Sequence, residues 1–279
     1  MASQRTTEPR VKLYWLNESR AQRIVWLLEE LGLPYDVEFF YRDGNMQAPP
    51  ELRKIHPLGK SPIVTITLPD PADPTKQKEV VLAESGVIAQ YLTEQFANGK
   101  TLLPKRYRDG QEGQPGGETD EWLRYQYYLQ YPEGSLMPPL LVGLILQILK
   151  GPKIPFFIRP ITSSVADKMS AAFLIPELIH HLDFLESQLE TSPDNGNYLC
   201  GNDLTTADIL MSFPLQLVRE RGAAVHDARG KDRLADKYPK VYAYLKRLEE
   251  EPGYKRAEAK IKELEKRKGQ TQTPRKYFS

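Results

Sequence analysis

The order of strand and helix patterns in the first hundred residues constrains the fold more than any other feature of this sequence. Two strand patterns flank a helix pattern, and two further strand patterns then precede a second helix pattern. The predicted strands are residues 11–16, 35–41, 63–68 and 79–82, and the predicted helices are residues 20–31 and 85–96. Strands joined through a helix can pair in parallel, whereas strands joined directly pair antiparallel. We therefore expect a small sheet with one parallel and one antiparallel half.

The rest of the chain reads differently. Residues 98–120 are rich in Gly, Asp, Glu and Gln without periodicity, which is typical of a linker, and everything after them follows helical spacing. Pro176 and Pro214 fall inside two of these helix patterns and are expected to kink or split them. The predicted organisation is an α/β domain (10–97), a linker (98–120), an all-helical domain (121–268) and a flexible basic tail (269–279). Residues 69–78 are expected to form an unusually long hairpin loop.

Composition excludes several functional classes. The formal net charge of +1 predicts no global attraction to nucleic acid, and the single Cys200 forms no intramolecular disulfide and suits a reducing cytosol. The longest apolar stretch, residues 136–149, is 14 residues long with two prolines, too short for a bilayer span, and is interpreted as a buried helix. The four histidines lack metal-ligand spacing, so no metal site is predicted.

Three turns of the α/β domain carry candidate chemistry. At the start of the first helix, Ser19 and Gln22 have the spacing of a capping box, and Ser19 either serves only as that cap or also donates to an anion held at the helix terminus. Arg20 and Arg23 add positive potential nearby.

The other two turns border strands. Pro62 begins a strand pattern: an ordinary trans proline would mark an edge strand, whereas a cis bond would leave the Ser61 backbone open to an extended ligand. Glu84 and Ser85 lie where the last strand meets a helix, either as a simple cap or as partners of an amine and a carboxylate. Together the three turns describe a pocket for one extended, zwitterionic ligand.

Five segments resemble the soluble glutathione S-transferases, in the order in which that family has them. They are SRAQRIVWLLEELGLPY, PPELRKIHPLGKSPIVTI, LAESGVIAQYL, LTTADILMSFPL and YPKVYAYLKRLEEEPGYKRA, and the similarity is strongest to the fungal Gtt-type branch. The resemblance implies an α/β thioredoxin-like N-terminal domain, an all-α C-terminal domain and a homodimer. It also implies that Thr205 and Asp208 form a capping box with Leu204 and Ile209 as its apolar staple.

The resemblance further implies a glutathione site. It places a cis-proline at Pro62, the backbone of Ser61 on the cysteinyl part of glutathione, Glu84 and Ser85 on the γ-glutamyl end, and His56 and Lys60 near the glycyl end or the cysteinyl backbone. Glutathione is thus the expected co-substrate, with no metal. For the group that stabilises the thiolate, Ser19 is the first candidate and the amide of Asn17 the second.

Aromatic residues suggest where an electrophile would bind. Trp15, Tyr125 and Tyr128 are candidates for lining that pocket, and the alternative is that these rings pack one domain against the other. Cys200 is interpreted as structural.

The expected function is conjugation of glutathione to small electrophiles, with hydroperoxide reduction as a second activity. The alternatives are a glutathione-binding interaction module with little catalysis, and a pathway enzyme acting on one metabolite. The expected location is the cytoplasm, or the periphery of the endoplasmic reticulum without membrane insertion.

Overall fold

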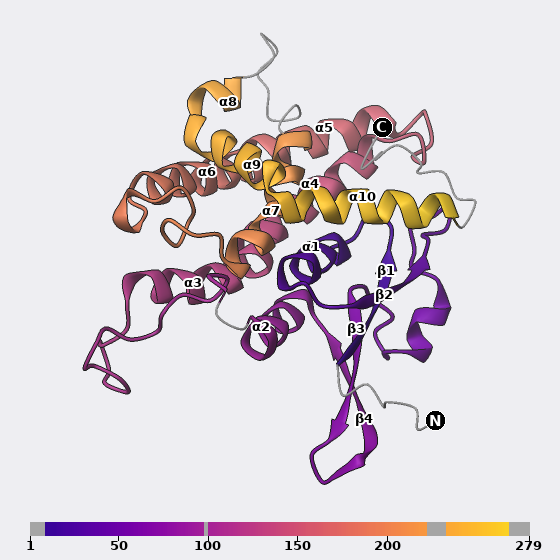
Figure 1. The fold of residues 1–279 in the computed structure, drawn as a ribbon. Helices are drawn as coiled ribbons and strands as arrows, with labels where there is room; N and C mark the ends of the chain where they lie inside the picture. The colour runs from indigo at the N-terminus through magenta and orange to yellow at the C-terminus, as the bar shows by residue number, and fades with distance from the viewer. Residues whose placement is uncertain (1–8, 98–99, 222–232, 268–279) are drawn as a thin grey trace. The chain divides into compact units, whose positions relative to one another are not determined.

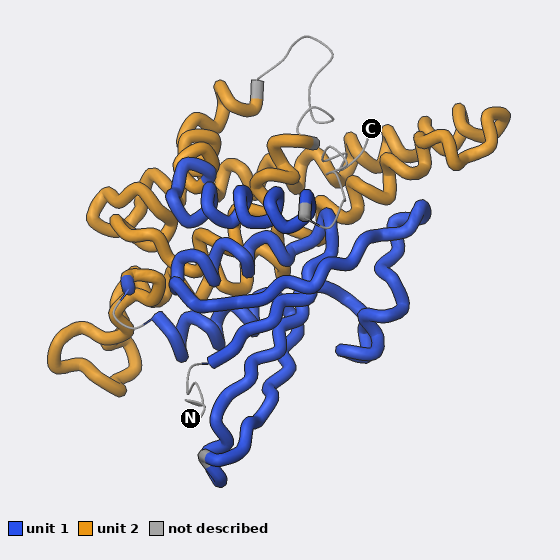
Figure 2. The backbone as a smooth tube through the Cα atoms, turned by 45° about the vertical axis from the view of Figure 1, so that its right-hand side comes forward, with its two compact units in different colours: residues 1–100, 249–279 blue, residues 101–248 orange. Residues whose placement is uncertain are grey.

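The computed structural model describes residues 9–97, 100–221 and 233–267. These residues form two compact units, one comprising residues 1–100 and 249–279 and the other residues 101–248 (Figure 2). The basic tail predicted at 269–279 lies outside the described residues. The predicted boundary differs from the observed one, because the last helix in the described part of the chain groups with the N-terminal unit.

Unit 1 is built on a four-stranded sheet (Figure 1). Its strands are β1 Arg10–Leu16, β2 Tyr35–Phe40, β3 Ile63–Asp70 and β4 Asp73–Ala83. They lie in the order β2-β1-β3-β4; β1 and β2 are parallel, and the other two pairs are antiparallel. The predicted half-parallel, half-antiparallel sheet is confirmed.

Two helices of unit 1 follow from the same sequence patterns. Helix α1, Ala21–Leu31, connects the parallel strands and is buried along most of its length, and it ends at Gly32, whose φ of 68° is the left-handed geometry that glycine adopts most readily. Helix α2, Ser85–Phe96, begins directly after β4. A short 3₁₀ turn, Pro50–Lys54, precedes β3.

The segment 69–78 is not the long loop that was expected. Strands β3 and β4 continue into it, pairing Leu68 with Lys78 and Pro69 with Gln77. The register then shifts, so that Asp70 pairs with Asp73 and the chain turns between them. The side-chain carboxylate of Asp70 accepts the backbone N–H of Ala72 at 2.9 Å, which closes the turn locally. Polar composition alone hid this strand extension, because an exposed antiparallel ribbon needs no apolar side chains.

The C-terminal helix α10, Pro252–Arg267, packs along α1 within unit 1. The rings of Trp26 and Tyr254 meet edge to face at 5.3 Å, and Gln22 donates to Glu258 at 2.7 Å. The sequence identified this helix but assigned it to the helical domain, because its amphipathic pattern does not name the surface that it covers.

Unit 2 is helical, and its two longest helical runs each contain one π-helical turn just before a proline. The first run is α3 Asp120–Tyr131, the π turn Pro132–Leu136 and α4 Met137–Lys150; the second is α5 Arg159–Met169, the π turn Ser170–Leu174 and α6 Ile175–Glu190. Pro138 and Pro176 have no N–H to donate, so the ladder shifts to i→i−5 bonds such as Met137 N–H to Pro132 O. The interruption predicted at Pro176 is confirmed.

The remaining helices of unit 2 complete its core. They are the 3₁₀ turn Pro193–Asn195, α7 Thr206–Arg221, α8 Arg233–Lys237 and α9 Pro239–Glu250. Helix α7 runs through Pro214 as one helix. The predicted linker is folded against itself from residue 101 onward, with Tyr107 bridged to Glu118 and consecutive turns between them.

The apolar run at residues 136–149 is only half buried. Met137, Leu140 and Leu146 are buried, whereas Leu141, Ile145 and others on α4 are exposed, so its interpretation as a buried helix is wrong for one face. The continuous helix Asp120–Lys150 is long and apolar enough to cross a membrane by length and composition, and 33% of its apolar window is buried.

Candidate functional site

The strand register brings the three sequence-predicted turns to one end of the sheet. Leu16 pairs with Phe40, Tyr14 pairs with Ile63, and Ile63 pairs with Ala83. The segments that follow β1, β2 and β4 therefore meet the segment that precedes β3. Helices α1 and α2 also begin at this end (Figure 1), and their N-termini favour negative charge there.

Ser19 is buried at the mouth of α1, but it does not form the predicted capping box. Its hydroxyl donates to the carbonyl of Leu16 at 2.7 Å and accepts the N–H of Ala21 at 3.2 Å. Gln22 reaches away to Glu258 instead of back to Ser19, because α10 offers it a carboxylate. The proton of the Ser19 hydroxyl is therefore already donated to the main chain.

Asn17 is held differently. Its amide oxygen accepts the backbone N–H of Arg42 at 2.8 Å, which leaves the amide N–H₂ group as the donor end. The Arg42 side chain also binds the main chain of this loop. Its Nε donates to the Asn17 carbonyl at 3.3 Å, and its Nη2 donates to the Glu18 carbonyl at 3.4 Å. A further bond from Nη1 to the Met46 carbonyl at 2.9 Å anchors the guanidinium.

The Ser61–Pro62 peptide bond is cis, which decides between the two readings of this proline. The Ser61 hydroxyl donates to the carbonyl of Tyr14 at 2.9 Å and lies 3.5 Å from the Ser19 hydroxyl. The structure therefore brings Ser19 and Ser61 together, although they are far apart in sequence.

Glu84 and Ser85 form the junction between β4 and α2. Glu84 has φ 68° and occupies the N-cap position without a side-chain cap bond, and Ser85 is the first helical residue. The Ser85 hydroxyl accepts a hydrogen bond from Nη2 of Arg23 at 2.8 Å. Both side chains are buried, since Arg23 is 2% exposed and Ser85 is 3% exposed.

His56 and Lys60 lie on the segment leading into Ser61. His56 is half-buried and Lys60 is exposed, and neither side chain makes a hydrogen bond or ion pair to the part of the chain that the structure describes. Both remain available to a ligand at this end of the sheet.

The three candidate electrophile residues are all buried. Trp15 packs against Phe39 in unit 1, with ring centroids 5.1 Å apart. Tyr125 and Tyr128 lie in the core of unit 2, where burial raises the pKa of the Tyr128 phenol well above its ordinary value. Both tyrosines therefore pack within unit 2.

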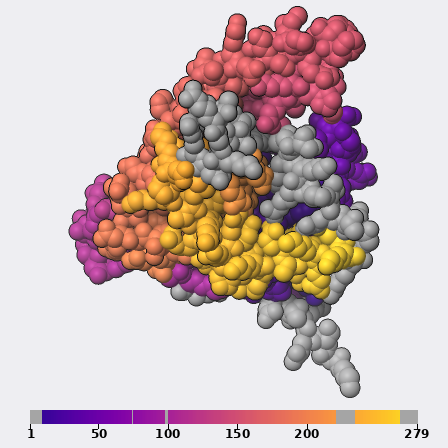
Figure 3. Space-filling model, turned by 90° about the horizontal axis from the view of Figure 1, so that it is seen from above, coloured from indigo at the N-terminus to yellow at the C-terminus, as the bar shows by residue number. Residues whose placement is uncertain are grey.

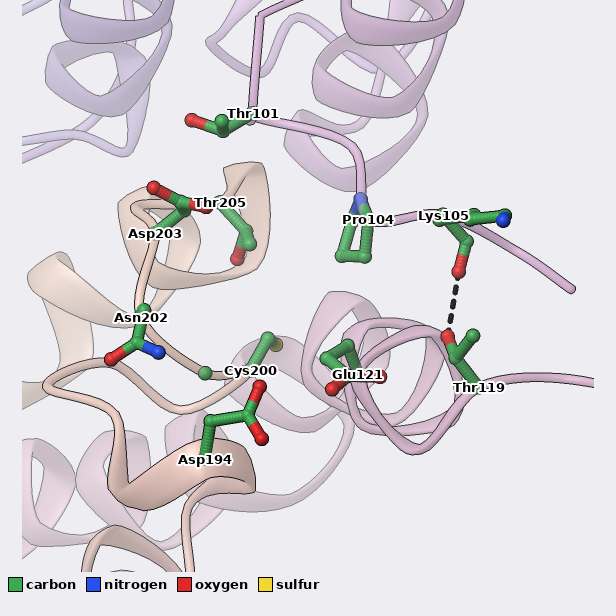
Figure 4. A pocket seen from close by; sticks show the side chains of 11 residues that line it. Thr101, Pro104, Lys105, Thr119, Glu121, Asp194, Cys200, Asn202, Asp203 and Thr205 are labelled. Carbon is green, nitrogen blue, oxygen red and sulfur yellow. Dashed lines mark hydrogen bonds between the residues drawn. The ribbon is translucent and has the colours of Figure 1, made fainter. Parts of the chain in front are cut away.

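Cys200 lines a cavity of about 230 Å³ within unit 2 (Figure 4). Its thiol is 3% exposed, and burial raises its pKa well above the usual value, which keeps it protonated. The carboxylates of Glu121, Asp194 and Asp203 also line the cavity, yet they do not converge into a metal-binding group in the described parts of the chain.

Sequence reasoning missed the roles of two arginines at the sheet end. Arg23 was recognised as nearby charge, but its bond to Ser85 spans 62 positions. Arg42 directly follows an aromatic strand and shows no local signal. The one available sign was an arginine within the nearly continuous apolar surface of α1, since a buried arginine is rarely left without a partner.

Comparison with known proteins places this geometry in a family. Residues 19–95 match the glutathione S-transferase N-terminal domain and residues 145–252 match its C-terminal domain. Glutathione S-transferase 1 of Saccharomyces cerevisiae is 38% identical over 92% of this chain and 97% of its own length. Glutathione S-transferase 3 of Schizosaccharomyces pombe is 30% identical over 74% of this chain and 73% of its own length.

Solved structures agree with the sequence relatives. A glutathione S-transferase from Actinobacillus pleuropneumoniae is 27% identical, covers 90% of this chain and 92% of its own, and has a TM-score of 0.61. A glutathione transferase from Phanerochaete chrysosporium, solved with oxidized glutathione, shares the fold at 18% identity, with a TM-score of 0.63 over 93% of this chain and 98% of its own. With a thioredoxin-like unit, a helical unit and a relative matched over nearly its whole length, the chain belongs to the glutathione S-transferase family of enzymes.

Proposed function

We propose that the sheet end of unit 1 binds glutathione and stabilises its thiolate for attack on a small electrophile. The observation that carries this proposal is that the segments holding Asn17, Ser61 and Ser85 meet at one end of the sheet, where α1 and α2 begin. These groups offer donors for a carboxylate, a main-chain edge for a peptide and a donor for a thiolate. Relatives of this fold have been solved with glutathione or its oxidized form bound.

Each part of glutathione has a proposed partner. Glu84 meets the γ-glutamyl ammonium and Ser85 its carboxylate, because a carboxylate and a hydroxyl donor lie side by side at the α2 terminus. The backbone of Ser61 pairs with the cysteinyl unit. Lys60 and His56 are the proposed partners of the glycyl carboxylate.

Asn17 is the better candidate for the thiolate donor, ahead of Ser19. The Ser19 proton is donated to the Leu16 carbonyl, whereas the Asn17 amide is oriented by Arg42 with its N–H₂ group still to donate. Lowering the thiol pKa by two units needs about 2.7 kcal/mol of preferential thiolate binding. One amide donor and the positive ends of two helices can supply that amount.

A direct test measures binding and catalysis together. Calorimetric titration with glutathione, and conjugation of glutathione to a chromogenic aryl halide, should both give positive results for the wild-type protein. Ser85→Ala should weaken binding, whereas Ser164→Ala, at an exposed position of unit 2, should leave both readouts unchanged. Binding without conjugation of any of several electrophiles would favour the interaction-module alternative. Hydroperoxide reduction in the same assay series would establish the second activity.

We also propose that the chain is a homodimer that uses the exposed apolar face of the α4–α5 hairpin. Exposed apolar residues occur on both helices and on the connecting loop. The segment that carries them is visible in the space-filling view, coloured pink to salmon (Figure 3). The members of this face are Leu141, Ile145, Ile148, Phe156, Phe157, Ile158, Ile161, Val165, Met169 and Phe173. On α5 they recur every four residues, which forms one stripe. An apolar surface of this extent marks an interaction site.

Light scattering after gel filtration tests the dimer. Wild type should elute as a dimer, Val165→Glu should shift it to monomer, and the neighbouring Ser164→Glu should leave it dimeric, because Ser164 lies outside the stripe. A monomeric wild type that sediments with phospholipid vesicles would instead favour a cytoplasmic protein held at the periphery of a membrane such as the endoplasmic reticulum.

A further inference from the structure

The buried guanidinium of Arg23 is the most unusual charged group at the sheet end of unit 1. It sits within α1, a helix whose side chains are almost all buried, and is itself only 2% exposed. Burying a charge is costly unless it is hydrogen-bonded. One of its bonds goes to a neutral hydroxyl, since Nη2 donates to Ser85 Oγ at 2.8 Å.

This bond fixes what the Ser85 hydroxyl can do. A serine hydroxyl has one proton to donate and lone pairs that accept. Arg23 can only donate, so the Ser85 oxygen is the acceptor here and its own proton remains to be given elsewhere. Among the described residues, no group accepts that proton. The guanidinium charge also polarises the O–H bond, which makes it a stronger donor to an anion.

Two other serine hydroxyls at this end of the sheet show the contrast. Ser19 donates its proton to the Leu16 carbonyl, and Ser61 donates its proton to the Tyr14 carbonyl. Both protons are committed to the main chain. Ser85 is therefore the one hydroxyl of these three that is set to donate to a ligand.

We infer that Arg23 is a positioning residue that orients and polarises the Ser85 hydroxyl toward a ligand carboxylate. The inference rests on the proposed glutathione site, where that carboxylate is the one on the γ-glutamyl α-carbon. Arg23 acts through Ser85 and supplies selectivity for a carboxylate over a neutral amide at this position. Without Arg23, the Ser85 hydroxyl would be free to rotate and to act as an acceptor. The preference for a carboxylate over an amide would then be weaker.

Calorimetry with two unreactive ligands tests this role. The probes are S-methylglutathione and its analogue in which the γ-glutamyl α-carboxylate is a primary amide. Wild type should bind the carboxylate form at least tenfold more tightly, a difference of about 1.4 kcal/mol. Ser85→Ala and Arg23→Met should each lower that ratio to within about threefold, and the double variant should lower it no further, because both act through one hydrogen bond.

Arg23→Lys gives an independent readout if Arg23→Met does not fold. The buried ammonium keeps the charge near neutral pH, so selectivity should be partly retained there. It should then decline, relative to the wild-type ratio measured at the same pH, as pH rises toward 9, because burial lowers the pKa of the lysine ammonium. Arg256→Met is the matched control: it removes a cation that pairs with Glu29 on the far part of α1 and should leave the ratio unchanged.

Two results would overturn the inference while leaving the proposed function standing. One is a wild type that binds both ligands equally. The other is an Arg23 variant with native circular dichroism that binds both ligands more weakly by the same factor, which would make Arg23 purely structural. Failure of wild type to bind either ligand would instead contradict the proposed glutathione site itself.

Discussion

Each unit has a set of polar side chains where loops enter helices, and the two sets, called clusters here, differ in how many of their hydrogen-bonding groups have partners within the protein. In unit 2, the Asp208 carboxylate accepts from the backbone N–H groups of Leu199 and Thr205 and from the hydroxyls of Thr205 and Tyr244. In unit 1, the hydroxyl of Ser85 and the amide of Asn17 are each held by an arginine through the oxygen only.

This difference separates a folding motif from the proposed binding site. Asp208 is fully buried, and desolvation raises its pKa above the usual value despite its four donors. All the donors around it are used internally, so the cluster can only hold α7, α9 and the preceding loop together. The unit 1 cluster keeps donor groups for a ligand, so its loss should cost binding more than stability.

The largest expected effect tests the unit 2 cluster around Asp208, in which every donor is used within the protein. Asp208→Asn should lower the free energy of unfolding by about 3 kcal/mol, because an amide cannot accept from four donors and places its own N–H₂ against some of them. Urea denaturation measures the change. Asp203→Asn, exposed five residues earlier, should cost less than about 0.5 kcal/mol. A loss below 1 kcal/mol for Asp208→Asn would remove the contrast between the clusters.

In the unit 1 cluster of Asn17 and Ser85, a substitution should lower catalysis more than stability. Arg42→Gln removes the side-chain bonds that hold the loop of Asn17, while the Arg42 backbone N–H stays in place. We expect kcat/KM for conjugation at neutral pH to fall about tenfold, equivalent to about 1.4 kcal/mol, with the thermal midpoint little changed. Lys78→Gln, which removes a charge from the exposed β3–β4 hairpin, is the control. A matched drop in stability would make Arg42 structural.

A smaller effect sharpens the comparison within unit 2. Thr205→Ala removes one of the four donors to Asp208 and should cost about 1 kcal/mol of stability, with glutathione affinity unchanged. Thr205→Ser keeps the hydroxyl and should retain most of that stability in the same denaturation experiment. If alanine and serine behaved alike, the hydroxyl would have no part in the cap.

The sequence predicted these two clusters unequally. The capping motif at Thr205 and Asp208 is local, so its bonds follow from a spacing of three residues. The Ser19 and Gln22 pair has the same spacing, yet Gln22 bonds to Glu258, because a helix more than two hundred residues later lies against it. A local sequence motif predicts the hydrogen bond of a side chain only where no residue distant in sequence competes for that side chain.

The fold shows the same division between local patterns, which the sequence predicts, and contacts between distant segments, which it does not. The strand order followed from short patterns and turns, because connection length sets parallel or antiparallel pairing. The extension of the β3–β4 hairpin, the placement of α10 in unit 1 and the exposed half of α4 all depend on what each surface meets. Periodicity identifies an apolar face but does not identify the surface that covers it.

The most direct test of the account is an ultraviolet pH titration of the thiolate of protein-bound glutathione in wild type, Asn17→Ala and Ser19→Ala. We expect the wild-type thiolate band to appear near neutral pH, Ser19→Ala to titrate almost identically, and Asn17→Ala to shift toward the value of free glutathione by at least one pH unit while still binding. Loss of the band in Ser19→Ala with Asn17→Ala unaffected would contradict the assignment, and a wild-type thiol pKa equal to that of free glutathione would contradict the activation of glutathione at this site.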